Sequence, residues 1–181
     1  FPALDKLIAV IEKKAKSLRG TIKTGRTHLM DAMPIDFAEE LYAWSSQLKS
    51  SKKMLLTLEK KLLELPQGGT AVGSGINAHK QFSKYFAQEM TKLLGNKIKC
   101  VKSENFYHEL SAQDCSVQLS GELKNLSVIL MKISNDLRWM NSGPLAGLSE
   151  IELKALQPGS SIMPCKVNPV IPEAVAMASA D

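Results

Sequence analysis

Apolar residues recur at alternating steps of three and four along three stretches of the chain, near residues 4–18, 37–65 and 119–140. This spacing places one apolar stripe along a helix, so each stretch predicts an amphipathic α-helix. The first stripe is Leu4, Ile8, Ile11, Ala15 and Leu18. The second is Phe37, Leu41, Trp44, Leu48, Leu55, Leu58, Leu62 and Leu65, and the third is Leu119, Leu123, Leu126, Leu130, Ile133, Leu137 and Met140.

Glycine and proline mark the ends of these helices, because neither continues a helix easily. Gly20 ends the first, Pro66 the second and Gly143 the third. A shorter helix is expected over about residues 79–94, and no stretch alternates strongly enough to predict a strand. We therefore expect an all-α fold, an elongated bundle of long helices with heptad-like packing.

The third long helix carries apolar residues outside its main stripe. These are Val117, Val128, Ile129 and Met131. A helix that is apolar on more than one face must be buried by several neighbours, more than so short a chain supplies. We therefore expect a homo-oligomer.

Composition limits the class of protein. The 181 residues are 44% hydrophobic and 23% charged, the balance of a soluble globular domain, and the length predicts one domain over residues 1–181. The net charge of +5 comes from lysines on helix faces without interleaved aromatic residues, which disfavours nucleic-acid binding. The three cysteines are too widely spaced for a disulfide framework or a zinc site.

The two ends of the chain suggest a fragment of a longer protein. The chain begins at Phe1 without a methionine, and it stops at Asp181 within a segment that is typical of a helix. No apolar run approaches the roughly 20 residues that a membrane helix needs, so we expect a soluble intracellular protein.

The first candidate for chemistry is His28, in the polar stretch of residues 25–32. Histidine is the residue type most often used for general acid or base catalysis, so His28 is a candidate for that role. The alternative is a histidine that only forms a hydrogen bond at a helix junction.

A second polar stretch, residues 67–77, holds four glycines, which allow the backbone to approach itself or a ligand closely. It lacks the Gly-Lys-Ser/Thr of a phosphate-binding loop and follows no predicted strand, so nucleotide binding is disfavoured. We interpret this stretch as a structural turn.

The third polar stretch, residues 157–169, is suited to anions. Ser160 and Ser161 lie on a loop bounded by prolines, with Lys166 and Asn168 shortly after them and a helix start beyond. A lysine supplies charge, an asparagine amide an orienting donor, and a helix start free N–H groups for a carboxylate. Without further information, turn formation or helix capping explains paired serines better than catalysis does.

Residues 159–168 resemble the signature GSSxMPxKxN of the fumarase/aspartase superfamily, and GRTHLMDA at 25–32 and GGTAVGSGIN at 68–77 accompany it in the superfamily's order and spacing. The resemblance extends over essentially the whole chain and is greatest to the class II fumarases, which interconvert fumarate and malate. It implies the central helical domain of the L-aspartase-like fold, whose long helices form a homotetrameric core. The flanking amino- and carboxy-terminal domains of the family are then absent from these 181 residues.

The resemblance also implies roles for the matching residues. Ser160 would be the base that removes the C3 proton of malate, and His28 and Glu173 a pair that handles the water. The substrate-binding residues would be Thr27, Ser161, Lys166 and Asn168. Lys166 and Asn168 would stabilise the aci-carboxylate that forms after proton removal. This chemistry implies no metal and no organic cofactor, and its partners are a small dicarboxylate substrate and further copies of the chain.

The resemblance leaves several matters open. Each site of this family combines segments from several subunits, so the chain would hold only part of a site. The resemblance implies a protein of the bacterial cytoplasm or of the mitochondrial matrix. Aspartate ammonia-lyase is an alternative, because its loop also resembles residues 167–173, and so is an inactive helical oligomerisation fragment. Cys165 stands where relatives carry glycine or alanine, and we expect it to stiffen or crowd the loop.

Overall fold

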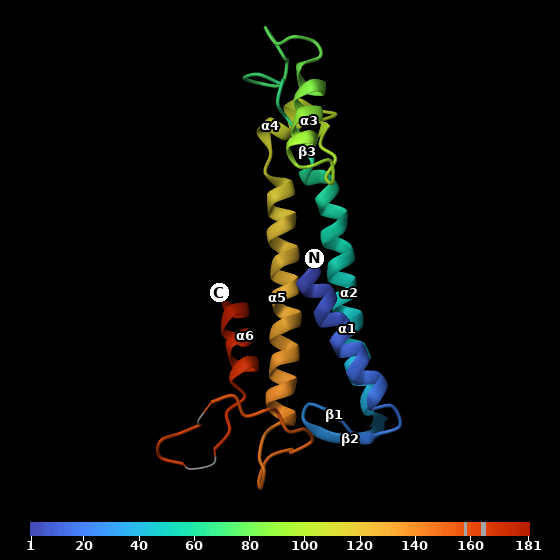
Figure 1. Ribbon diagram of the computed structural model, residues 1–181, viewed down its shortest axis with the longest axis vertical. Helices are drawn as coiled ribbons and strands as arrows, with labels where there is room; N and C mark the ends of the chain where they lie inside the picture. The colour runs from blue at the N-terminus through green and yellow to red at the C-terminus, as the bar shows by residue number, and fades with distance from the viewer. Residues whose placement is uncertain (158, 164–165) are drawn as a thin grey trace. The chain divides into compact units, whose positions relative to one another are not determined.

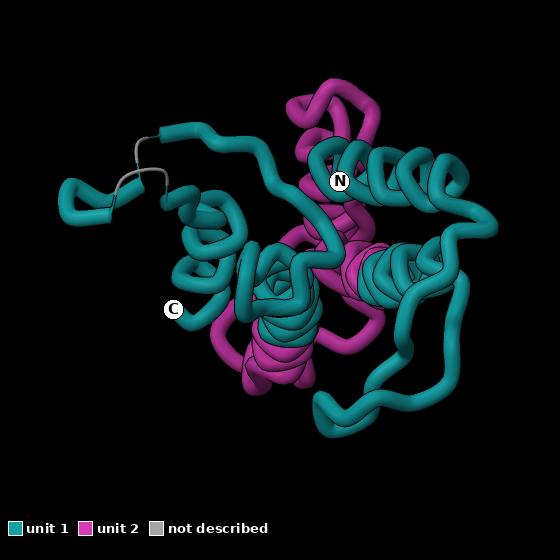
Figure 2. The backbone as a smooth tube through the Cα atoms, turned by 90° about the horizontal axis from the view of Figure 1, so that it is seen from below, with its two compact units in different colours: residues 1–51, 123–181 teal, residues 52–122 magenta. Residues whose placement is uncertain are grey.

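The computed structural model describes residues 1–157, 159–163 and 166–181. The chain forms two compact units, one of residues 1–51 and 123–181 and the other of residues 52–122 (Figure 2). Two long helices, α2 (Phe37–Leu62) and α5 (Asp114–Met140), contribute residues to both units.

The helices confirm the predicted all-α class (Figure 1). Besides α2 and α5, they are α1 (Pro2–Ser17), α3 (Phe82–Leu93), α4 (Phe106–Ser111) and α6 (Val170–Ala180). No helix among the described residues combines the length and the apolar composition needed to cross a membrane.

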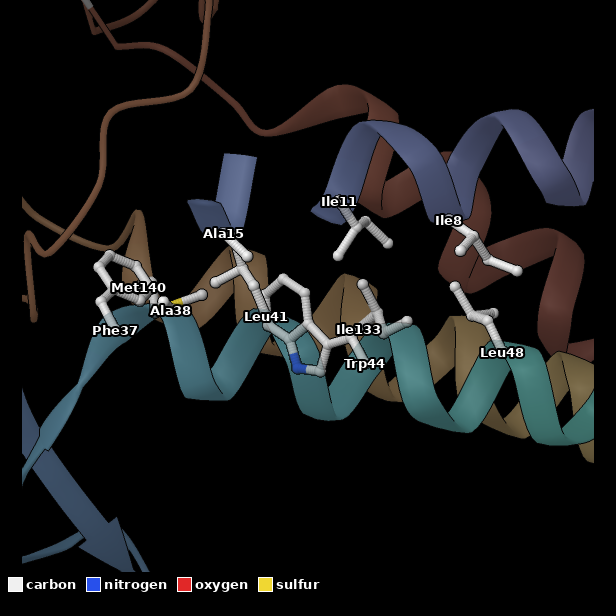
Figure 3. Packing of buried hydrophobic residues seen from close by; sticks show 10 residues of the cluster. All are labelled: Ile8, Ile11, Ala15, Phe37, Ala38, Leu41, Trp44, Leu48, Ile133 and Met140. Atoms are coloured by element: carbon white, nitrogen blue, oxygen red, sulfur yellow. The ribbon is translucent and has the colours of Figure 1, made fainter. Parts of the chain in front are cut away.

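The core of the first unit joins α1, α2 and α5 (Figure 3). All of its buried residues except Ala38 come from the predicted stripes; they are Ile8, Ile11, Ala15, Phe37, Ala38, Leu41, Trp44, Leu48, Ile133 and Met140. Trp44 is 3% exposed, and its indole Nε1 donates a hydrogen bond to Asp136 Oδ2 at 3.2 Å. This bond satisfies the one polar atom that the indole ring brings into the core.

Replacing Trp44 by alanine should lower the free energy of unfolding by about 3–5 kcal/mol, because a cavity replaces the ring. Urea unfolding followed by circular dichroism measures the loss. Trp139 is the matched control: it is 53% exposed, so its replacement by alanine should cost less than about 1 kcal/mol. Equal losses at both positions would contradict this assignment of the core.

The apolar surplus of α5 is only partly covered. Ile129 packs against the core of the first unit, whereas Val117, Leu123 and Val128 are at least 50% exposed. Two of the four apolar residues outside the main stripe, Val117 and Val128, are thus exposed, and the homo-oligomer expected from these four stays a prediction.

Two strands that the sequence analysis did not predict form a hairpin between α1 and α2. β1 (Ile22–Thr27) pairs antiparallel with β2 (Met30–Asp36). The residues of β2 before Asp36 are exposed, so this strand has no buried face. Without a buried face, apolar and polar residues need not alternate, and that alternation is the signal by which a half-buried strand is recognised in a sequence. Asp36 ends the ribbon and caps α2, accepting hydrogen bonds from Gly20 N and Ala38 N at 2.9 Å.

The second unit is organised around its glycine-rich stretch. Short strands β3 (Glu64–Leu65) and β4 (Val101–Lys102) pair in parallel. In the sequence, α3 precedes β4 and α4 follows it. A Cβ atom on Gly69 would come within 2.9 Å of Phe106, and one on Gly73 within 2.8 Å of Tyr107. These glycines let the stretch lie directly on α4, which supports its interpretation as a structural turn.

Candidate active site

Thr27 and His28 lie at the tip of the hairpin. Thr27 pairs with Met30, so only His28 and Leu29 form the turn. Their φ angles are 52° and 62°, and positive φ at both central residues is the requirement of a type I′ turn. Thr27 and His28 are exposed, so the turn presents both side chains to the outside.

The backbone of this turn is strained. Leu29 has a bulky side chain without a polar atom to stabilise a left-handed conformation, and such a residue costs on the order of 1–3 kcal/mol. Strain of this size persists only where the surrounding structure determines the conformation, and it is common at functional sites.

A partly buried ion cluster lies at the base of the hairpin. Lys23 Nζ of β1 is 2.5 Å from Glu40 Oε2 of α2 and 2.9 Å from Glu150 Oε2. Arg26 Nη1 donates to Glu150 Oε1 at 2.7 Å. The four side chains are 10–21% exposed, with two charges of each sign, so the cluster is electrically balanced.

The cluster stabilises the charged form of its members. Burial lowers the pKa of Lys23, but the hydrogen bonds to Glu40 and Glu150 outweigh it and leave the pKa raised. Burial likewise raises the pKa of Glu150, but the interactions of its carboxylate with Lys23 and Arg26 outweigh the effect of burial and leave this pKa lowered. Both groups therefore remain ionised at neutral pH.

The contribution of Glu150 to stability should disappear in acid. Its folded pKa lies below its ordinary value of 4.5, so the contribution is complete above pH 4.5 and is lost as the pH falls through the folded pKa. Urea unfolding should show Glu150→Gln clearly less stable than wild type at neutral pH, with the difference shrinking below pH 4.5. Glu39→Gln, at an exposed neighbouring carboxylate, should show no comparable difference. A difference for Glu150→Gln that is constant with pH would contradict the ionic role.

A cavity of about 650 Å³ adjoins the cluster within the first unit. His28 and Arg26 line it from the hairpin, Asp136 and Trp139 from α5, and Glu150 from the segment after α5. A volume of this size admits a small molecule.

The serine loop, the loop that carries Ser160 and Ser161, follows the segment that contains Glu150. Ser160 Oγ accepts a hydrogen bond from Ile162 N at 3.1 Å, which is a local turn of the kind that serine favours. Ser160 is half-buried, and Ser161 is exposed. Gly159 has no room for a Cβ atom because the carbonyl oxygen of Lys166 lies against it, so the loop returns close to its own start. Cys165 lies outside the described residues, and the effect expected of it stays a prediction.

Lys166 and Asn168 lie directly before α6. Lys166 is exposed, Asn168 is half-buried, and the Asn168 carbonyl accepts a hydrogen bond from Val170 N at 2.9 Å. Glu173 lies in the first turn of α6 and is exposed. A cation and an amide at the positive end of a helix form a suitable place for a carboxylate.

The predicted residues lie in two groups, and these do not meet. Figures 1 and 2 both place the hairpin and the serine loop on opposite sides of the carboxyl end of α5, within the first unit. The hydrogen bonds and ion pairs of the described residues include none between His28 and Glu173. No set of three or more His, Cys, Asp or Glu among them could hold a metal ion.

The sequence profile of a protein family described as lyase matches residues 1–181, the full length of the chain. The chain belongs to this lyase family. Its helical fold agrees with that of the family's solved structures. The recombinant class II fumarase from Schistosoma mansoni superposes with a TM-score of 0.95 at 35% sequence identity, over 99% of this chain and 40% of the other.

Bacterial members of this lyase family are also similar in sequence. The class II fumarate hydratase of Xylella fastidiosa strain Temecula1 is 55% identical over 177 residues, which are 98% of this chain and 37% of that protein. The class II fumarate hydratase 2 of Pseudomonas aeruginosa is 53% identical over 180 residues, 99% of this chain and 39% of that protein. The chain thus spans less than two fifths of the length of these two lyases.

Sequence reasoning missed the ion cluster of this lyase chain. Glu150 lies 124 positions from Arg26 and in none of the three polar stretches, so no local pattern joins them. The available signal was the pair of cations Lys23 and Arg26 on either side of Gly25, at the start of the first polar stretch.

Proposed function

We propose that this chain is the central helical domain of a longer fumarate hydratase, which adds water reversibly to fumarate to form L-malate. The observation that carries the proposal is the 55% identity to a class II fumarate hydratase over 98% of the chain. The bacterial source of that relative favours the cytoplasm as the compartment.

In the proposed mechanism, Ser160 acts as the base on malate and takes the proton from C3. Lys166 and Asn168 bind the carboxylate next to C3, and negative charge moves into it as the proton leaves. Support comes from the position of both residues before α6, because a cation, an amide and the positive helix end all favour the dianionic aci-carboxylate.

The hydroxyl group then leaves C2 with a proton, which completes a molecule of water and the double bond of fumarate. We assign this proton transfer to His28 with Glu173 as its partner, and substrate contacts to Thr27 and Ser161. A carboxylate beside an imidazole orients the ring and stabilises its protonated form.

We further propose that the complete site forms between copies of the chain in a homotetramer. The hairpin group with Thr27 and His28 and the loop group with Ser160, Lys166 and Asn168 lie on opposite sides of α5, so one copy does not unite them. The exposed apolar residues of α5, Val117, Leu123 and Val128, supply a surface for the contact between copies.

The test uses the purified full-length protein that contains this chain. Adding L-malate should raise the ultraviolet absorbance of fumarate, and adding L-aspartate should release no ammonia. Ammonia from aspartate would replace the proposal by aspartate ammonia-lyase, and no reaction with either compound would refute it. Light scattering on residues 1–181 alone should show a tetramer, and the malate assay should show no turnover, because the flanking parts of the site are missing. Turnover by this fragment would show that the flanking domains are dispensable, and a monomer would refute the tetramer.

A further inference from the structure

We propose that Glu150 is a positioning residue, which holds the hairpin turn with Thr27 and His28 in place through its ion pairs with Arg26 and Lys23. The inference rests on the proposed function, because it assigns Glu150 a part in presenting two residues of that site. Glu150 itself reaches the substrate in no step of the proposed mechanism.

Two cations of one strand, Lys23 and Arg26, reach the same carboxylate. Lys23 and Arg26 are three residues apart, and in an undisturbed strand such residues point to opposite faces. The pairing of β1 with β2 shifts register between Thr24 and Arg26, and this irregularity adds twist to the ribbon. Gly25 lies at the shift, where a Cβ atom would come within 2.6 Å of the Met33 carbonyl oxygen. The local distortion thus brings both cations onto Glu150.

The carboxylate of Glu150 belongs to a segment that hydrogen bonds hold in place. Glu150 N and Ile151 N both donate to the carbonyl oxygen of Met140, at 2.8 and 3.2 Å, and Leu153 N donates to Asn141 Oδ1 at 2.7 Å. The segment around Glu150 is therefore fastened to the end of α5. Its side chain is 13% exposed, which limits the competition of water for the ion pairs.

The turn at His28 and Leu29 follows closely after Arg26 in the chain. Arg26 directly precedes Thr27 and His28, so any displacement of Arg26 is transmitted to both through the backbone. The positive φ angles of His28 and Leu29 are costly and need an external restraint to persist. The bond from Arg26 Nη1 to Glu150 Oε1, at 2.7 Å, supplies this restraint within two residues of the turn.

Glu40 offers a matched comparison. It has the same charge, is 21% exposed, and pairs with Lys23 at 2.5 Å. Among the described residues, Arg26 pairs with Glu150 at 2.7 Å and with the exposed Asp31 of the same hairpin at 3.8 Å, so Glu150 is the partner that ties Arg26, two residues before the turn, to the rest of the unit. Loss of either carboxylate leaves one uncompensated cation, whereas only the loss of Glu150 should displace Thr27 and His28.

The experiment compares Glu150→Gln and Glu40→Gln in the full-length enzyme, with kcat and KM for malate expressed per folded tetramer. Glu150→Gln should lower kcat by more than about tenfold, because small misplacements of catalytic groups have effects of this size or larger. Glu40→Gln should change kcat by less than about threefold and lower the melting temperature by a similar amount as Glu150→Gln. The proposal is overturned if Glu150→Gln stays within tenfold of wild type, or if both variants lose the same activity.

Two further measurements separate positioning from stability and from the proposed function. The double variant Glu150→Gln/Lys23→Gln restores the charge balance, so its melting temperature should recover while its kcat stays low; recovery of both would show a purely structural role. If Glu150→Gln does not assemble, Glu150→Asp keeps the charge but shortens the reach, and an unchanged kcat would overturn the proposal. A wild-type enzyme without fumarate hydratase activity refutes the function itself, whereas an active wild type with an unaffected Glu150→Gln refutes only the positioning.

Discussion

Replacing Ser160 by alanine in the full-length enzyme should lower kcat for malate dehydration by about 1,000-fold, within the range of 100- to 10,000-fold for the loss of a general base. The substitution removes the oxygen that takes the C3 proton and leaves Lys166 and Asn168 to bind the carboxylate. KM should therefore change much less than kcat. Absorbance at the fumarate band under saturating malate measures the loss.

Ser161→Ala is the comparison for this variant. Ser161 is assigned a substrate contact, so its replacement should raise KM more than it lowers kcat. Light scattering must show that both variants remain tetrameric. Turnover of Ser160→Ala near the wild-type rate would remove Ser160 from the role of base.

Replacing Lys166 by methionine should lower kcat by about 100- to 1,000-fold, the effect seen when one preorganised group at a developing negative charge is removed. Methionine keeps much of the length of the side chain but supplies no charge for the aci-carboxylate. The fall in kcat should exceed the change in KM, because the second negative charge of the carboxylate exists only after proton removal. Steady-state kinetics with malate separate the two constants.

Lys154→Met is the matched control. Lys154 is an exposed lysine on the same segment, ahead of the serine loop. Its replacement removes the same net charge without touching the assigned site, so kcat should stay near the wild-type value. Equal losses for the two lysines would indicate a general effect of surface charge and would contradict the role of Lys166.

The proposed tetramer explains why the two groups of site residues lie apart in one copy. Different elements of the first unit present the two groups: the hairpin tip carries Thr27 and His28, and the described residues before α6 include Ser160, Lys166 and Asn168. A second copy that packs on the exposed apolar residues of α5 could bring the hairpin of one chain to the loop of another. His28 lies exposed at the hairpin turn, and both interpretations of it, as a catalytic group and as a junction histidine, stay predictions.

The sequence by itself determined the helices α1, α2 and α5 and most of the core that they form. Ile11, Trp44 and Ile133 belong to three predicted stripes and meet in one buried cluster, because a period of three and four residues is a local property that the chain carries wherever a helix forms. The motifs likewise indicated the family, since residues 25–32, 68–77 and 159–168 keep their order and spacing within one chain.

Only the tertiary structure decided how the hairpin is held. β1 and β2 lack the apolar alternation that a buried face would impose, and the carboxylate of Glu150 meets Arg26 across 124 positions of sequence. Such contacts depend on how α5 and the segment after it return to the start of the chain. No local periodicity encodes that return, because it follows from the packing of the whole first unit.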